Sequence, residues 1–299
     1  MSPGTDPELD AVVAELRDLD PEGHRTAAVL RETLDQLYDG QRTGRYHWEQ
    51  LYKTEKTHCG TLVEINMQRE FDFDDGDTLD YRIAGIEVDC KFSQRFGGWM
   101  IPKEAREQLC LVLWATDKGS KWSMGVVRAT AEHLRPTSNR DQKTSLNERG
   151  REAVSLLHSN AGLPENLLLQ LPRETVDRIF APRSGAAKVR ELFRHVQRTP
   201  INRVAVATVG KQADYMKRIR GNGGARSQLR PEGIIILGQY ERHRIIATAL
   251  GLPAPDKGES VSARVCPCDP NSQHAVEIDG SWWRLATDQD PTVMAPRLP

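Results

Sequence analysis

Residues 78–92 read Thr78-Leu79-Asp80-Tyr81-Arg82-Ile83-Ala84-Gly85-Ile86-Glu87-Val88-Asp89-Cys90-Lys91-Phe92. Polar and apolar side chains alternate on both sides of Ala84-Gly85, which is the period-two pattern of β-strands. A glycine in a two-residue turn supplies the positive φ that such a turn needs. We therefore predict a β-hairpin that turns at Ala84-Gly85 and places Asp80 opposite Asp89.

This register gives the hairpin two chemically different faces. Because successive side chains of a strand point to opposite sides, one face is apolar and the other carries Asp80, Arg82, Glu87, Asp89 and Lys91. Directly opposed Cβ atoms lie about 5 Å apart. Two carboxylates at that distance repel unless a cation lies between them or they share a proton. A divalent cation fits better here, and oxygen ligands favour Mg²⁺.

Two further residues complete the predicted site. Lys91 lies on the same face as Asp89, where its ammonium can position and help to deprotonate a water molecule or neutralise a phosphate. Glu64, on a helix predicted over residues 57–70, supplies another metal ligand or a supporting hydrogen bond. This set has the form of a PD-(D/E)xK nuclease site, with Leu79-Asp80 in place of the usual Pro-Asp. A structural ion-pair cluster is the alternative.

The composition is that of an ordinary folded protein. The chain has 299 residues, of which 38% are hydrophobic and 28% charged, so it can bury the core of one large or two ordinary domains. No apolar run approaches the roughly 18 residues of a membrane helix, and the N-terminal residues do not resemble a secretion signal. Five cysteines without framework spacing suggest a reduced environment. We expect a cytoplasmic protein without a membrane partner.

Charge is distributed unevenly along the chain. The net charge of −1 does not by itself suggest a nucleic-acid partner. Residues 183–230, however, hold twelve lysines and arginines against only two acidic residues. A basic segment of this density is typical of contact with an anionic polymer, although a solvated helix face has the same composition.

Hydrophobic periodicity predicts a two-domain organisation. Helical spacing covers residues 7–19 and 25–39, and strand patterns cover residues 79–83, 86–92, 109–115 and 122–128. Turn-forming residues at 157–166 break both periods. We predict an α/β domain over residues 1–157, a linker over 158–165 and a mainly helical α+β domain over 166–299. In the second domain, helical patterns cover 186–197, 201–209, 212–220 and 242–250, and strand patterns cover 233–238, 275–278 and 282–286.

Several longer segments of the sequence resemble one protein family. They include Thr33–Arg45, Lys53–His58, Gly60–Asn66, Val88–Ser93, Glu165–Leu169, Met216-Lys217-Arg218, Arg220-Gly221, Gly223–Ser227 and Leu229–Gly238. Together they are similar to the NaeI-type restriction endonucleases, from about residue 19 to residue 265. A set of such shared segments is far more specific for a family than any single motif.

The resemblance implies a detailed set of properties. It implies a homodimeric type IIE restriction enzyme whose N-terminal endonuclease domain has a mixed sheet flanked by helices. It also implies a C-terminal effector domain, topoisomerase-like, with a helix-turn-helix like that of catabolite-activator proteins. The substrate would be double-stranded DNA at the palindrome GCCGGC, with a second DNA copy as activator and a DNA methyltransferase as genetic partner. The family's acidic and lysine positions fall on Glu64, Asp80, Asp89 and Lys91.

Leu37-Tyr38-Asp39-Gly40 has the appearance of a ligase motif. DNA ligases carry Lys-x-Asp-Gly, in which the lysine forms a nucleotidyl adduct. Leucine stands at that position here, so the reaction has no nucleophile, and no tyrosine lies in a recognisable strand-joining motif. We interpret the segment as the end of a helix, with Leu37 buried.

The C-terminal basic segment contains the candidate DNA contacts. Residues 201–209 and 212–220 have the spacing of two helices joined by a turn near Gly210, as in a helix-turn-helix. The glycines of Asn222-Gly-Gly-Ala-Arg226 would allow backbone amides to approach a phosphate. Our candidates here and near the Glu64 helix are Lys53, Lys56, Lys217, Arg218, Arg220, Arg226 and Arg230. A catalytically silent helix-turn-helix regulator is the alternative function.

Overall fold

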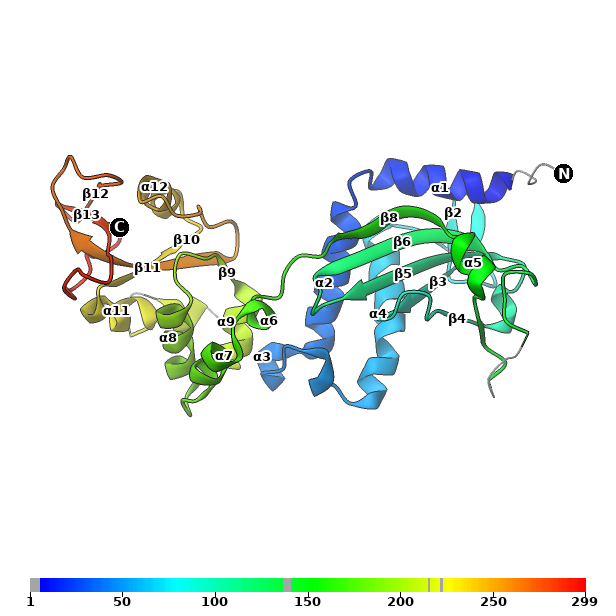
Figure 1. The fold of residues 1–299 in the computed structure, drawn as a ribbon, viewed down its shortest axis with the longest axis horizontal. Helices are drawn as coiled ribbons and strands as arrows, with labels where there is room; N and C mark the ends of the chain where they lie inside the picture. The colour runs from blue at the N-terminus through cyan, green and yellow to red at the C-terminus, as the bar shows by residue number, and fades with distance from the viewer. Residues whose placement is uncertain (1–5, 137–140, 215, 221–222) are drawn as a thin grey trace. The chain divides into compact units, whose positions relative to one another are not determined.

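The computed structural model describes residues 6–136, 141–214, 216–220 and 223–299. The chain forms two compact units (Figure 1). The first unit contains the segments up to Tyr38 and from His47 to Asn166, and the second contains Asp39–Tyr46 and Leu167–Pro299. The chain therefore passes between the units three times. Gly221 and Asn222, in the glycine-rich segment discussed above, lie outside the described residues.

A six-stranded mixed sheet forms the centre of the first unit. Its order is β1 (Asp74–Asp75), β2 (Tyr81–Ile83), β3 (Ile86–Ser93), β5 (Leu109–Thr116), β6 (Lys121–Arg128) and β8 (Ser155–Gly162). β3 and β5 are parallel, and the other neighbours are antiparallel. The strands predicted at residues 109–115 and 122–128 are confirmed, and both lie in the middle of the sheet.

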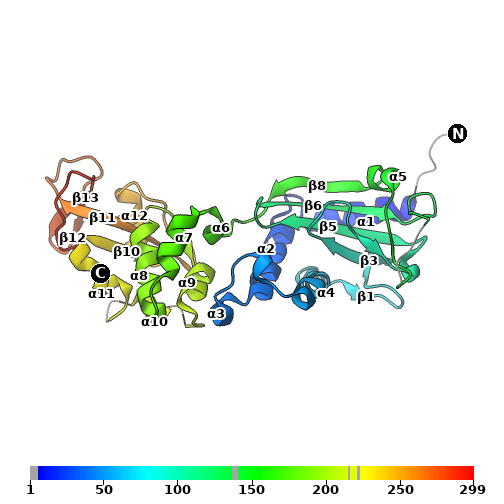
Figure 2. The same cartoon turned by 60° about the horizontal axis from the view of Figure 1, so that its bottom comes forward.

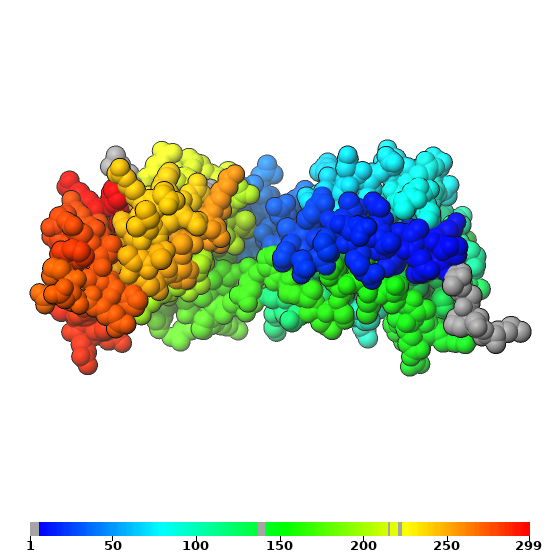
Figure 3. Space-filling view, turned by 90° about the horizontal axis from the view of Figure 1, so that it is seen from above, coloured from blue at the N-terminus to red at the C-terminus, as the bar shows by residue number. Residues whose placement is uncertain are grey.

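Three long helices cover one face of this sheet. α1 (Pro7–Leu19), α2 (His24–Tyr38) and α4 (Lys53–Phe71) pack their apolar residues against alternate residues of the strands (Figures 1 and 2). Figure 3 shows α1, in dark blue, on the outside of the unit. All three predicted helices are confirmed, although α4 begins at Lys53 rather than residue 57, because Glu55 caps the backbone amide of Tyr52.

Shorter elements cover the opposite face. They are β4 (Met100–Ile101), β7 (Thr144–Ser145) and α5 (Glu148–Glu152). β4 pairs with β7, and a 3₁₀ turn (Lys103–Ala105) follows β4 in the sequence. Trp99, Ile101 and Leu146 are fully buried there against Cys110 and Val112 of β5. The sheet thus has an apolar core on each side, and helices flank it mainly on one side.

The hairpin of β2 and β3 has the predicted register. Tyr81 pairs with Val88, Arg82 with Glu87 and Ile83 with Ile86. Ala84 and Gly85 have φ angles of 52° and 75°, so both residues of the turn are left-handed, as hairpin turns of this length require. Strand pairing ends at Tyr81, and the Asp80 carboxylate, instead of its backbone, accepts a hydrogen bond from the Cys90 amide at 2.6 Å.

The second unit is built on an antiparallel sheet. Its order is β10 (Ile234–Gly238), β11 (Glu259–Pro267), β13 (Ser281–Leu285) and β12 (Val276–Ile278), and β9 (Ile201–Asn202) also pairs with β11. Ile234 and Ile236 face a core made with α8 (Gly185–His195), α9 (Arg203–Gly210) and α11 (Ala225–Leu229). Ile235 and Leu237 face a second core made with α12 (Glu241–Ala249) and the C-terminal segment. The unit begins with α6 (Leu167–Gln170) and α7 (Arg173–Phe180).

Two sequence-based boundaries were wrong. Residues 158–162 of the predicted linker belong to β8, which pairs with β6 as the outer strand of the sheet. Its turn-forming residues are tolerated because half of the strand faces solvent and its pairing shifts register near Met124. The helix predicted over 212–220 is confined, among the described residues, to α10 (Met216–Ile219).

The segment Leu37–Gly40 ends a helix, as predicted. Leu37 is buried, α2 ends at Tyr38, and Asp39 is left-handed with a φ of 45°. A short helix, α3 (Gly40–Thr43), then packs on α9 within the second unit. Gly40 lies so close to Thr208 that a Cβ atom at Gly40 would be 2.1 Å from the Thr208 hydroxyl oxygen. The glycine is therefore required for the packing of α3.

We expect Gly40→Ala to destabilise the second unit by about 1–3 kcal/mol, because the added methyl overpacks a close contact. Thermal unfolding of the variant, followed by circular dichroism, measures the effect. Gly60→Ala is the matched control, since Gly60 lies inside α4 with open space around its Cβ position. That change should be neutral or stabilising by up to about 1 kcal/mol. Equal melting temperatures for Gly40→Ala and the unmodified protein would contradict the packing argument.

Candidate active site

The hairpin brings Asp80, Asp89 and Lys91 together. The Lys91 ammonium donates to Asp89 Oδ1 at 2.8 Å, to Asp80 Oδ2 at 3.3 Å and to the Cys90 carbonyl at 2.7 Å. Asp89 and Lys91 point to one side of β3, while Val88 and Cys90 point into the core beneath the helices. The charged face predicted from the alternating sequence therefore exists, and Lys91 connects the carboxylates of Asp80 and Asp89.

Asp89 is the buried member of the cluster. Its side chain is almost completely buried, and its Oδ2 atom has no hydrogen-bond partner among the described residues. Burial is the main cause that raises the pKa of Asp89 to about 6; Lys91 opposes this effect, and Asp80 adds to it. A buried carboxylate oxygen without a hydrogen-bond partner is costly, so a cation or a donor bound at Oδ2 would stabilise it.

Glu64, on α4, interacts electrostatically with Asp80 and Lys91. The Tyr81 hydroxyl donates to the Glu64 backbone carbonyl at 2.8 Å, which fixes this turn of the helix against the hairpin. Burial raises the pKa of the half-buried Glu64 carboxyl, and the negative charge of Asp80 raises it further, whereas Lys91 lowers it. Glu64 thus shares the electrostatic environment of Asp80 and Lys91.

Lys91 provides positive charge to the cluster. Burial lowers the pKa of its ammonium, but Asp89 and Asp80 outweigh that effect and raise the pKa above the ordinary lysine value. The side chain is held by three acceptors and remains partly accessible. It can therefore place a fixed ammonium beside an anionic ligand.

The donor set fits a divalent cation at this place. Asp80 and Asp89 present hard oxygen atoms, and Asp89 Oδ2 is an oxygen without a partner. Within the described ranges, His, Cys, Asp and Glu side chains do not form a group of three arranged to hold a metal. The protein alone therefore supplies two carboxylates and a nearby third, and waters would have to complete the coordination shell, as is usual for Mg²⁺.

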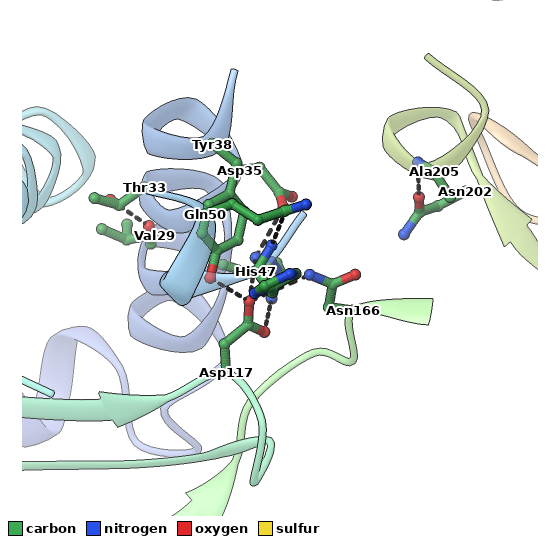
Figure 4. A network of polar contacts seen from close by, with 11 residues as sticks. Val29, Thr33, Asp35, Tyr38, His47, Gln50, Asp117, Asn166, Asn202 and Ala205 are labelled. Atoms are coloured by element: carbon green, nitrogen blue, oxygen red, sulfur yellow. Dashed lines mark hydrogen bonds and ion pairs between the residues drawn. The ribbon is translucent and has the colours of Figure 1, made fainter. Parts of the chain in front are cut away.

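A second buried carboxylate, Asp117, was not found from the sequence. It accepts from Arg31 at 2.5 Å, from the Tyr38 hydroxyl at 2.7 Å and from the Asn166 amide at 3.2 Å (Figure 4). Arg31 also donates to Asp35 at 2.8 Å. Both oxygens of Asp117 have partners, which distinguishes it from Asp89 and indicates a structural role. Its partners are far apart in sequence, so no local pattern identifies the cluster.

The predicted DNA contacts are scattered over several elements. Lys53 is exposed and Lys56 half-buried in the first turn of α4, with the Lys56 ammonium 5.9 Å from the centre of the Trp48 ring. In the second unit, Lys217 and Arg220 are exposed and Arg218 is half-buried. Arg226 and Arg230 are drawn inward, where their Nε atoms donate to the carbonyls of Ile236 at 2.8 Å and Ala295 at 3.0 Å.

None of the described helices is long and apolar enough to cross a membrane.

Comparison with known proteins identifies the family of the chain. Residues 10–294 match the sequence model of the family described as restriction endonuclease NaeI. The chain is also 52% identical, over 302 residues, to the type II restriction enzyme NaeI of Lentzea aerocolonigenes, with 98% of this chain and 95% of that enzyme covered.

The family match and the sequence identity show that the chain is a restriction endonuclease. The match extends over nearly the whole chain and includes both units, so it does not concern a shared domain alone. The chain belongs to the NaeI family.

Proposed function

We propose that the protein is a type IIE restriction endonuclease that hydrolyses double-stranded DNA with Mg²⁺ at the palindrome GCCGGC. The observation that carries the catalytic part is the buried Asp89 carboxylate, with an unpartnered Oδ2 and with Asp80 and Lys91 beside it. The recognition sequence is the one that the family resemblance implies. Protection of host DNA would then require a DNA methyltransferase of the same specificity.

In this proposal, Asp80 and Asp89 hold the metal ion, and Glu64 binds it directly or through water. Bound Mg²⁺ would polarise the scissile phosphate and lower the pKa of a coordinated water. Lys91 donates a hydrogen bond to the attacking water or to the phosphate, so that its charge offsets the negative charge that grows as the phosphorus is attacked. Burial of Asp89 keeps its carboxylate fixed and excludes bulk water from one side of the site.

We further propose that the second unit binds DNA through a helix-turn-helix like that of catabolite-activator proteins. α9 and the following α10 and α11 provide successive short helices, and β9 and β10 both pair with β11 beside them. In this proposal the DNA contacts of the second unit are Lys217, Arg218, Arg220, Arg226 and Arg230. Arginine suits a GC-rich site because it pairs with guanine in the major groove. Lys53 and Lys56 would contact the cleaved duplex.

The remaining proposals concern assembly and regulation. A palindromic site implies a homodimer, in which each first unit cleaves one strand. The first unit is proposed as the catalytic domain and the second as the effector domain. Binding of a second DNA copy to the second unit then activates cleavage.

The decisive experiment is incubation of the full-length protein with plasmid DNA and Mg²⁺, followed by sequencing of the ends. We expect ends that map to one GC-rich palindrome and no cleavage in EDTA. A protein that binds this DNA but never cleaves it would instead be a helix-turn-helix regulator with a silent nuclease unit.

Effector activation predicts that a short duplex containing the recognition site stimulates cleavage of a plasmid that is cut poorly. We expect the initial rate to rise by at least about fivefold, which corresponds to an activation free energy lower by about 1 kcal/mol. A duplex of the same length with a scrambled site is the control. Equal rates with both duplexes over a wide concentration range would contradict activation.

A further inference from the structure

A cavity in the second unit has an unusual concentration of positive charge. It lies between α11, β10, α12 and the C-terminal segment and has a volume of about 510 Å³. Arg226, Arg230, Arg297, His243 and Ser227 supply its polar walls, and none of its lining residues is acidic. This volume is within the usual range for sites that bind small organic ligands.

Arg226 is held in a fixed orientation at this cavity. Its Nε atom donates to the Ile236 carbonyl at 2.8 Å, so the guanidinium lies against the end of β10. Gly238 allows this position, because a Cβ atom there would lie 2.9 Å from Arg226 Nη2. The side chain is therefore built into the wall and does not move freely in solvent.

Arg226 forms no ion pair with an acidic side chain of the described residues. Burial lowers the pKa of its guanidinium, and the electrostatic interaction that opposes this effect comes from Tyr240 and not from a carboxylate. Other arginines of the second unit do form ion pairs with acidic side chains: Arg194 pairs with Glu232, and Arg244 pairs with Asp256. A half-buried guanidinium without a counter-ion favours binding of an external anion.

Arg230 adds a second fixed guanidinium to the wall. Its Nε atom donates to the Ala295 carbonyl at 3.0 Å, which fixes this side chain at the cavity. The other two polar side chains already have acceptors within the protein. His243 Nδ1 accepts from the Gly238 amide at 3.1 Å and its Nε2 atom lies 3.3 Å from the Pro299 carbonyl oxygen, while the Ser227 hydroxyl donates to the Gly224 carbonyl at 3.0 Å. The terminal nitrogens of the two guanidinium groups are the donors that match the acceptors of a phosphate group.

We propose that this cavity, called here the Arg226 cavity, is a binding site for a phosphate group. The phosphate belongs either to a small molecule, such as inorganic phosphate or a nucleoside monophosphate, or to the backbone of DNA bound at the second unit. The site is separate from the metal-binding carboxylates of the first unit and does not depend on the nuclease activity.

The test uses the full-length protein in EDTA, with inorganic phosphate and deoxycytidine monophosphate as probes. Isothermal titration measures binding at constant ionic strength, with chloride as the competing anion. We expect Arg226→Gln to weaken binding of both probes at least tenfold, and Arg244→Gln, which removes a paired arginine of the same unit, to leave it unchanged. Unchanged phosphate binding in Arg226→Gln, or no binding to the unmodified protein, would overturn the proposal.

A geometric variant separates the site from a general charge effect and from loss of folding. Gly238→Ala keeps every charge but displaces the Arg226 guanidinium, so it should weaken phosphate binding as Arg226→Gln does. If it binds phosphate normally while its melting temperature is unchanged, the proposed site is wrong.

A further titration in the presence of a site-bearing duplex distinguishes the two sources of phosphate. Competition between the duplex and free phosphate identifies a DNA phosphate, and independent binding of both identifies a small-molecule site.

Discussion

Asp89→Ala should abolish DNA cleavage while leaving DNA binding by the second unit nearly unchanged. The variant removes the buried carboxylate that the proposed metal ion requires, and Lys91 then pairs with Asp80 alone. Loss of metal-ion charge stabilisation costs several kcal/mol, and each 1.4 kcal/mol is about tenfold in rate, so we expect a decrease of about 10³-fold or more. Initial cleavage rates and electrophoretic mobility shifts measure the two activities.

Glu87→Gln is the matched control for this variant. Glu87 lies on the same strand and the same charged face, but it caps the backbone amides of Asp77 and Thr78 and pairs with Arg82 instead of Lys91. We expect cleavage within about threefold of the unmodified protein, because the proposed site is unchanged. Full activity of Asp89→Ala would remove the metal assignment, and equal loss in both variants would indicate a structural effect of the hairpin.

Asp117→Ala should lower the free energy of unfolding by about 3–5 kcal/mol, because it leaves the buried Arg31 cation without its main partner. Arg31 and Asp117 are 8% and 4% exposed, so water cannot replace the lost interaction. For a unit of this size the melting temperature should fall by roughly 6–20 °C. Calorimetry or circular dichroism of the full-length protein measures the shift.

Glu174→Ala provides the comparison, because Glu174 forms an exposed ion pair with Arg178 on α7. That change should cost less than about 1 kcal/mol. A double variant, Arg31→Met with Asp117→Ala, should be less destabilised than the sum of the single changes, since it removes both buried charges. Additive losses would show that Arg31 and Asp117 do not depend on each other.

The hairpin could be predicted from sequence because its signals are local. Alternation over residues 78–92 sets which side chains share a face, and a glycine in the turn sets the register. Those two facts bring Asp80, Asp89 and Lys91 together without knowledge of the rest of the fold. Placement of Glu64 needed only the helix that precedes the hairpin, since α4 lies directly against β3.

Other features depend on contacts that no local pattern contains. β8 has the composition of a turn region and becomes a strand because β6 offers it a free edge. The Asp117 cluster joins residues from α2, the turn after β5 and the segment after β8 that contains Asn166. Arg226 and Arg230 lie in a basic segment that is typical of surface DNA contacts. Their side chains nevertheless turn inward, because they donate hydrogen bonds to carbonyls of β10 and of the C-terminal segment.

The second unit is not continuous in the chain, because residues 39–46 pack within it through Gly40 and α9. A protease that cut the backbone once after Asn166 would therefore leave two fragments joined non-covalently, with α3 supplied by the N-terminal fragment. A recombinant piece that starts at Leu167 would lack this helix and expose the surface around Thr208. Independent production of the second unit requires that residues 39–46 be added back, in the same chain or as a peptide.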